Sequence, residues 1–230
     1  KHWPNFANIY RVNSSFQLNG TEEEYGGSGL GLATLMKEYY PEIEEATHFF
    51  SFQNSVYFRS DSVKGYENEL LVADSSFFKV FNCNFLEGQA EYCLAQERSI
   101  VISQSFAQKY FGDKPALGRT INTSNFEYRV TGVFEDIPDN THHNFNAVIS
   151  EPRVASDTLS LAVSLWQVSR FTFLKVPSAL EAQNIEANFD QFFNCYMAGI
   201  ADAVQAEYRI KLQQISDIHF NTNPGFDAIG

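Results

Sequence analysis

Apolar residues along the chain recur with two different spacings, one typical of helices and the other of strands. Between Leu32 and Tyr40 they recur every three or four residues, which predicts a helix with one buried face that Pro41 ends. A second helix is predicted after Ser178, because Ser178 and Glu181 have the spacing of a capping box. Its expected buried face consists of Ala182, Ile185, Phe189, Phe192, Phe193 and Tyr196.

Segments rich in β-branched and aromatic residues predict strands. They cover residues 8–18, 47–60, 69–74, 99–103, 126–136, 145–150, 170–176 and 207–215. In one of them Tyr128, Val130, Gly132 and Phe134 alternate with other residues, so all four are expected on one face of a sheet. Both ends of the chain thus have the order strand, helix, strand.

This order predicts an α+β fold in two parts. The two ends, residues 1–88 and 165–230, are expected to form one layered α+β unit. Residues 89–164 are then a mostly β insertion, and the polar segment after Glu151 is expected to be a connector.

The stretch from Ser103 to Ile121 carries strong local signals within the predicted insertion. Ser103 is a helix N-cap, and Gly112 ends the helix. Pro115 and Gly118 then indicate a turn. The expected buried face is Phe106, Ala107, Tyr110 and Phe111. Asp74 is predicted to be the N-cap of a shorter helix, which is expected to end near Gly88.

The net charge of −12 excludes several classes of function. Nucleic acids and anionic lipids are bound by clustered Lys and Arg, and here 28 acidic residues outnumber 16 basic ones. No run of about 18 apolar residues predicts a membrane span. The chain opens without an initiator methionine or a signal peptide, which suggests a segment of a longer protein.

Candidate chemistry is sparse. The segment 26–31, GGSGLG, lacks the spacing of a phosphate-binding loop and is interpreted as a flexible linker. His142 and His143, with Asp136 and Asp139 nearby, make a metal site conceivable, although a solvated turn fits their spacing better. No nucleophile has the setting of a catalytic elbow. The sequence therefore predicts no catalytic residues, no metal and no cofactor.

The three cysteines Cys83, Cys93 and Cys195 have no metal-binding spacing. Because each lies among apolar residues, buried free thiols are expected. A bridge between Cys83 and Cys93 stays open as an alternative if the compartment is oxidising.

Three motifs resemble the extracytoplasmic domain of MacB/FtsX-like ABC transporter permeases, in the form common in Bacteroidetes. The first is an aromatic segment that ends at Gly88, and the last contains Gly132, Pro138 and His142. Between them lies a segment from Ile100 to Ile121. The positions identified from this resemblance as structural motif residues are Gly88, Phe111, Gly112, Pro115, Gly118, Gly132 and Pro138.

The resemblance implies a porter-like α+β subdomain formed by both chain ends, with a β-rich, Sabre-like subdomain inserted between them. It implies a non-catalytic domain in the periplasm, attached to the cell inner membrane by transmembrane helices of the same permease. The implied partners are a cytoplasmic ATP-binding subunit or domain, a second permease copy in a homodimer, and a periplasmic adaptor or lipoprotein. Motion driven by ATP hydrolysis would then reach a substrate or partner outside the membrane.

Two other functions stay open beside the permease domain. One is a free-standing periplasmic binding module without membrane spans. The other is a metal-dependent hydrolase that uses His142, His143 and the nearby aspartates. Neither the resemblance nor the residues identify a transported substrate.

Overall fold

The structure, a computed structural model, describes residues 6–18, 21–52, 54–61, 63–137, 145–151, 162–204 and 206–218. The chain divides into two compact units. Within the described part, the insertion unit lies between Phe49 and Arg153, and the base unit consists of the stretches before and after it.

The base unit contains a sheet with the strand order β14-β1-β13-β4. These strands are β1 (Ile9–Leu18), β4 (Glu45–Ser51), β13 (Val168–Lys175) and β14 (Ala206–Gln214). Strand β1 is antiparallel to both β13 and β14. Helices follow the first and the third strand along the chain, which is the split βαβ arrangement of ferredoxin-like folds. The insertion unit occupies the connection between the second strand and the third.

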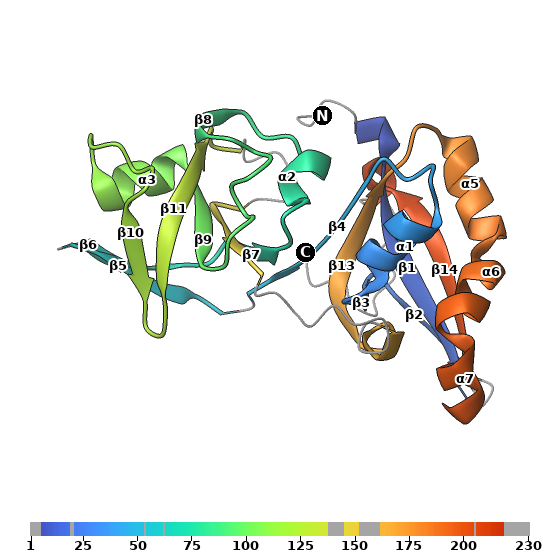
Figure 1. Cartoon of the computed structure of the whole chain (residues 1–230). Coiled ribbons are helices and arrows are strands. Elements are labelled where there is room, and N and C mark those ends of the chain that lie inside the picture. The colour runs from blue at the N-terminus through green and yellow to red at the C-terminus, as the bar shows by residue number, and fades with distance from the viewer. Residues whose placement is uncertain are drawn as a thin grey trace. The chain divides into compact units, whose positions relative to one another are not determined.

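Several helices of the described residues belong to the base unit (Figure 1). They are α1 (Leu32–Tyr39), α5 (Ala179–Ala187), α6 (Phe189–Tyr196) and α7 (Ala198–Val204). Buried residues of α1, α5 and α6 share one hydrophobic cluster with Val12, Leu174 and Tyr208 of the sheet. These three helices therefore cover the same face of the sheet. Short 3-10 helices lie at Phe6–Asn8 and Ile215–Asp217.

The predicted helices of the base unit are confirmed, with one difference. The side chain of Ser178 accepts a hydrogen bond from the Glu181 amide, as the capping box predicted. The helix that follows is interrupted at Asn188, whose side-chain amide donates to the Asn184 carbonyl at 2.8 Å. The predicted buried face continues across this break, because Ile185 and Phe192 are both fully buried.

The interpretation of segment 26–31 as a flexible linker is wrong. Ser28 and Gly29 form strand β3 (Ser28–Gly29), which pairs with β13, and a second added strand, β2 (Thr21–Tyr25), pairs with β1. The buried Ser28 hydroxyl donates to the Thr172 hydroxyl at 2.7 Å. A Cβ atom on Gly29 would lie 2.3 Å from the Ser164 carbonyl oxygen, so glycine is required because the two backbone segments are in contact.

The insertion unit is a mixed sheet with the order β7-β12-β9-β11-β10-β5-β6. Its strands are β5 (Val56–Ser60), β6 (Val63–Glu67), β7 (Leu70–Ala73), β9 (Ser99–Ser103), β10 (Thr120–Thr123), β11 (Glu127–Phe134) and β12 (Ala147–Ser150). A further strand, β8 (Phe85–Gly88), pairs with the second half of β11. The pairs β7–β12 and β9–β11 are parallel, and the α+β fold class is confirmed.

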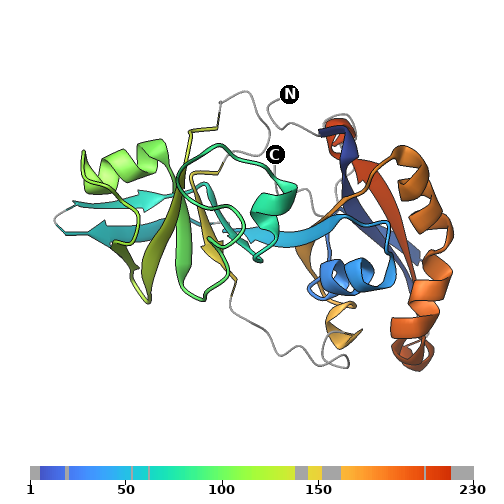
Figure 2. The same cartoon turned by 45° about the horizontal axis from the view of Figure 1, so that its top comes forward.

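Two helices cover opposite faces of this sheet (Figure 2). Helix α3 (Gln104–Phe111) packs Phe106 and Tyr110 against a core that includes Phe58, Ile100 and Val130. Helix α2 (Phe77–Val80) supplies phenylalanine rings to the other face, where Phe78 and Phe145 contact Phe134. The prediction that Asp74 is the N-cap is wrong, because α2 begins later and its N-cap is Ser76. The Asp74 carboxylate instead accepts from the Ser76 amide at 2.7 Å, just before the helix.

The boundaries of the insertion unit differ from the expected residues 89–164. The unit begins at Phe49 because the early strands pair with later ones: β5 pairs with β10, and β7 pairs with β12. The local patterns of the early strands do not reveal these partners. That the two units correspond to porter-like and Sabre-like subdomains stays a prediction.

The Gly29→Ala variant should lower the free energy of unfolding by about 2–4 kcal/mol, because its methyl group overlaps the backbone of Ser164 and Leu165. The matched control is Gly199→Ala, at a position where an added Cβ meets no atom within 4 Å. This control should leave the free energy unchanged or raise it by up to about 1 kcal/mol. Chemical denaturation measures both, and equal effects would contradict the assignment of Gly29 to a close backbone approach.

Candidate functional site

The structure places most of the predicted motif residues in the insertion unit. Pro138 lies outside the described residues, and so do His142, His143 and Asp139. Asp136 is described, and its carboxylate accepts from the Ser105 amide at 2.9 Å. Because Ser103 also caps this end by accepting from the Phe106 amide, Asp136 acts as a second acceptor at the start of α3. The predicted N-cap is confirmed.

The C-terminal end of α3 is held by an arginine from the following turn. Gly112 ends the helix at a φ of 61°, and Gly118 in the turn has a φ of 80°. The Arg119 guanidinium lies 4.9 Å from the centre of the buried Phe111 ring and forms an ion pair with Asp61 at 3.1 Å. Pro115 lies in the connection between the helix and this turn. That these residues set the backbone geometry stays a prediction.

A buried carboxylate connects α3 to strand β6. Glu67 accepts from the Lys109 ammonium at 2.6 Å and from the Tyr110 hydroxyl at 2.8 Å. The side-chain amide of Asn146 donates to the other carboxylate oxygen at 3.3 Å. Burial and the Glu67 carboxylate both raise the pKa of Tyr110. The carboxylate is thus satisfied by three donors, and its arrangement is that of a structural network.

Strand β11 has a β-bulge at Thr131. Its pairing with β9 shifts between Val130 and Gly132, which leaves one extra residue in β11. Because of this extra residue, side chains that strict alternation would place on one face lie on opposite faces before and after Thr131. The expectation that Tyr128, Val130, Gly132 and Phe134 share one face is therefore wrong. Val130 belongs to the core under α3, whereas Phe134 contacts the rings around α2.

The bulge is fixed by a hydroxyl and a glycine. The Thr131 hydroxyl lies 2.6 Å from the Cys93 carbonyl oxygen, its closest acceptor. Gly88 has a φ of 85°, and a Cβ on it would lie 2.5 Å from the Thr131 carbonyl oxygen. Gly88 therefore combines a left-handed backbone with a close approach to the bulge.

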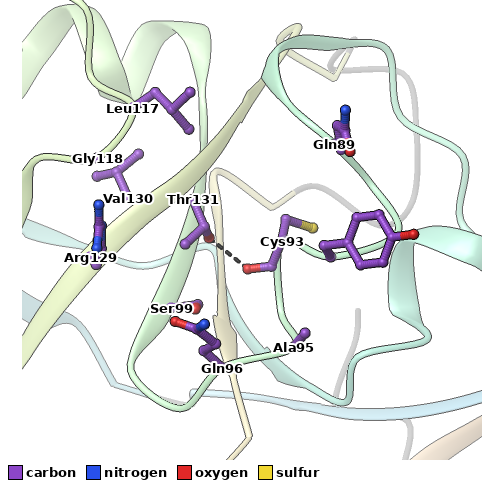
Figure 3. Close-up of a pocket in the computed structure, with 11 residues that line it drawn as sticks. Gln89, Cys93, Ala95, Gln96, Ser99, Leu117, Gly118, Arg129, Val130 and Thr131 are labelled. Atoms are coloured by element: carbon purple, nitrogen blue, oxygen red, sulfur yellow. Dashed lines mark hydrogen bonds between the residues drawn. The ribbon is translucent and has the colours of Figure 1, made fainter.

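A hollow of about 570 Å³ lies beside the bulge (Figure 3). It opens where the partner of β11 changes from β10 to β8. The lining is mixed, with the apolar side chain of Leu117, the cation of Arg129 and the amide of Gln96. Such a lining can hold an amphipathic side chain, and the hollow contains no residue pair that would carry out catalysis. Sequence reasoning identified Gly118 here but missed the hollow itself.

The cysteines differ in their environments. Cys93 is buried and Cys83 partly buried, whereas Cys195 on α6 is exposed, so the expectation of a buried thiol is wrong for Cys195. Burial raises the pKa of Cys93 to about 12. Burial and, to a smaller extent, the neighbouring Cys93 also raise the pKa of Cys83. All three cysteines are free thiols in the structure.

Within the described ranges, no group of three or more His, Cys, Asp and Glu side chains is placed to hold a metal ion. No helix in the same ranges is long and apolar enough to cross a membrane. The described residues therefore offer a scaffold and a mixed surface hollow as their candidate site.

The sequence model of the MacB-like periplasmic core domain matches residues 2–192. The chain belongs to this family. No curated protein sequence is similar enough to the chain to indicate a relative.

Solved structures of three transporter or permease domains have a similar fold. A domain of a protein assigned as a permease from Porphyromonas gingivalis has a TM-score of 0.75 and 17% identity, over 98% of this chain and 96% of that one. The periplasmic region of MacB from Actinobacillus actinomycetemcomitans has a TM-score of 0.55 and 15% identity, over 93% of this chain and 94% of that one. The extracellular domain of the noncanonic ABC-type transporter YknZ from Gram-positive bacteria has a TM-score of 0.53 and 13% identity, over 89% of this chain and 100% of that one.

Replacing Glu67 by glutamine should lower the free energy of unfolding by about 1–3 kcal/mol, because the Lys109 ammonium and the Tyr110 hydroxyl lose a charged acceptor. Glu45→Gln is the matched control, since the side chain of Glu45, which pairs with Lys37, is 24% exposed against 10% for Glu67. Its loss should stay below about 1 kcal/mol. Urea denaturation measures the free energy of unfolding of both variants. A larger decrease for Glu45→Gln than for Glu67→Gln would contradict the structural role of the Glu67 network.

Proposed function

We propose that this MacB-like domain is the non-catalytic periplasmic part of an ABC transporter permease and that it transmits motion. In this proposal ATP is hydrolysed by a cytoplasmic subunit or domain, and the permease works as a homodimer in the cell inner membrane. The domain passes the resulting movement to a substrate or to a partner outside the membrane. Membership of the MacB-like periplasmic family carries the proposal.

The path of the chain between the two units supports a mechanical role. The boundary at His48 and Phe49 falls inside strand β4 rather than in a loop. Just before β4, the Glu44 amide donates to the Lys175 carbonyl of the base unit at 2.9 Å. Within β4, Phe49 pairs with Ala73 of the insertion unit. Strand β4 thus contributes residues to both units, and in this proposal a displacement passes from one unit to the other along it.

The polar clusters of the insertion unit fit the same proposal. The polar clusters around Glu67 and Asp136 are held by hydrogen bonds inside the fold. A unit whose charged groups are held in this way is suited to moving as a body, because its close-packed interior yields little when one part is displaced.

Spin labels on Cys195 test this function in the full-length permease with its ATP-binding partner, in lipid nanodiscs, after cysteines outside this chain are replaced. Cys195 is exposed, whereas the raised pKa of Cys93 and Cys83 keeps those thiols protonated and slow to react. The distances between the labels of the two protomers should change when a non-hydrolysable ATP analogue is added. The Cys195→Ser variant is the control and should give no such signal.

Identical distance distributions with and without the nucleotide would contradict the transmission of motion. A labelled permease that shows no distance between protomers at all would contradict the homodimer.

A further inference from the structure

One face of the insertion-unit sheet is covered by α3, and the opposite face at the β6 end presents polar and aromatic side chains. Residues paired across neighbouring strands point to the same side of a sheet. The register joins Tyr57 with Tyr66 and Arg59 with Lys64 between β5 and β6. It continues through Asn122, which pairs with Arg59 on one side and with Glu127 on the other, and Thr120 pairs with Arg129. We call this set the open face: Tyr57, Arg59, Lys64, Tyr66, Thr120, Asn122, Glu127 and Arg129.

The alternate residues of the same strands confirm which side is open. Phe58, Ile121 and Val130 lie in the core under α3 and are fully buried. On the open face, by contrast, Tyr66 is 69% exposed, and its ring lies 5.4 Å from that of Tyr57. The exposed ring of Tyr66 beside the half-buried ring of Tyr57 is typical of a contact surface for another protein.

The open face is positively charged although the chain is acidic. It carries three cations, Arg59, Lys64 and Arg129, against the single carboxylate of Glu127. None of the three cationic side chains forms an ion pair within the part of the chain that the structure describes. Lys109 and Arg119 of the same unit, by contrast, each form an ion pair with a carboxylate. On a chain with a net charge of −12, three cations that have no ion pair among the described residues thus gather on one face of the sheet.

The hollow beside the bulge adjoins the open face through Arg129, which belongs to both. Figure 3 shows Arg129 and Leu117 along the same side of this hollow. An apolar side chain of a bound protein can enter there while its acidic neighbours meet the cations of the sheet. This combination of an aromatic pair, cations and a recess is how protein interfaces obtain both affinity and register.

We propose that the open face binds an acidic surface of a protein partner. The net charge of −12 argues against an anionic lipid surface, because the rest of the chain would be repelled by it. The rings of Tyr57 and Tyr66 and the adjoining hollow favour a protein, whose side chains they can contact. This inference rests on the proposed function, because it describes the chemistry of the partner that receives the motion. It can fail while the proposed function holds, because binding to the open face needs neither ATP nor the membrane part of the permease.

A fluorescent peptide in which glutamate and tyrosine alternate is the probe, added to the 230-residue chain at low salt. Its binding should weaken as salt is raised, and it should shift the backbone NMR signals of β5, β6 and β10. Arg59→Glu and Arg129→Glu should each lower the affinity about fivefold or more, because an attraction becomes a repulsion. Tyr66→Ala should lower it without any change in charge.

Lys211→Glu is the matched control, since it reverses an exposed lysine on β14 of the base unit. It should leave the affinity unchanged although the net charge of the chain changes equally. Equal losses for Lys211→Glu and Arg59→Glu would overturn the proposal, and so would an absence of binding.

Two further results would show that the open face binds something other than an acidic protein, and each would overturn the proposal. One is binding of phosphatidylglycerol vesicles at the same residues without binding of the peptide. The other is self-association of the chain that Arg59→Glu abolishes while the peptide stays unbound.

Discussion

The insertion unit depends on one change of pairing, at Thr131 in strand β11. Before this residue β11 pairs with β10, and after it with β8, while the register with β9 shifts at the same point. The shift sends Val130 into the core under α3 and Phe134 into the phenylalanine cluster at α2. A single bulge thus lets one strand serve cores on both faces of the sheet.

The same bulge produces the surface features from which function is inferred. The hollow opens where the neighbour of β11 changes, and Arg129 lies on the open face just before the bulge. Because the Thr131 hydroxyl lies 2.6 Å from the Cys93 carbonyl oxygen, it fixes the segment that forms one wall of the hollow. The proposed partner surface and the two cores of the insertion unit therefore have a common structural origin.

Local signals in the sequence predicted the helices and their caps, as at Ser103 and Ser178, because these interactions lie within three residues of each other. Features that depend on distant partners could not be predicted. Gly29 looked like a linker residue because its neighbours Ser164 and Leu165 are far along the chain. The open face was missed for the same reason, since its side chains come from four strands that are brought together only by pairing.

The most direct test of the account is hydrogen exchange on the Thr131→Val variant, which keeps the shape of the side chain and removes the hydroxyl. The amide of Cys93, which donates to the Gln89 carbonyl, should exchange faster, because the Cys93 carbonyl loses its hydroxyl donor. Amides in α3 should exchange as in the unmodified chain. Unchanged exchange at Cys93, or equal acceleration throughout the insertion unit, would contradict the central role of the bulge.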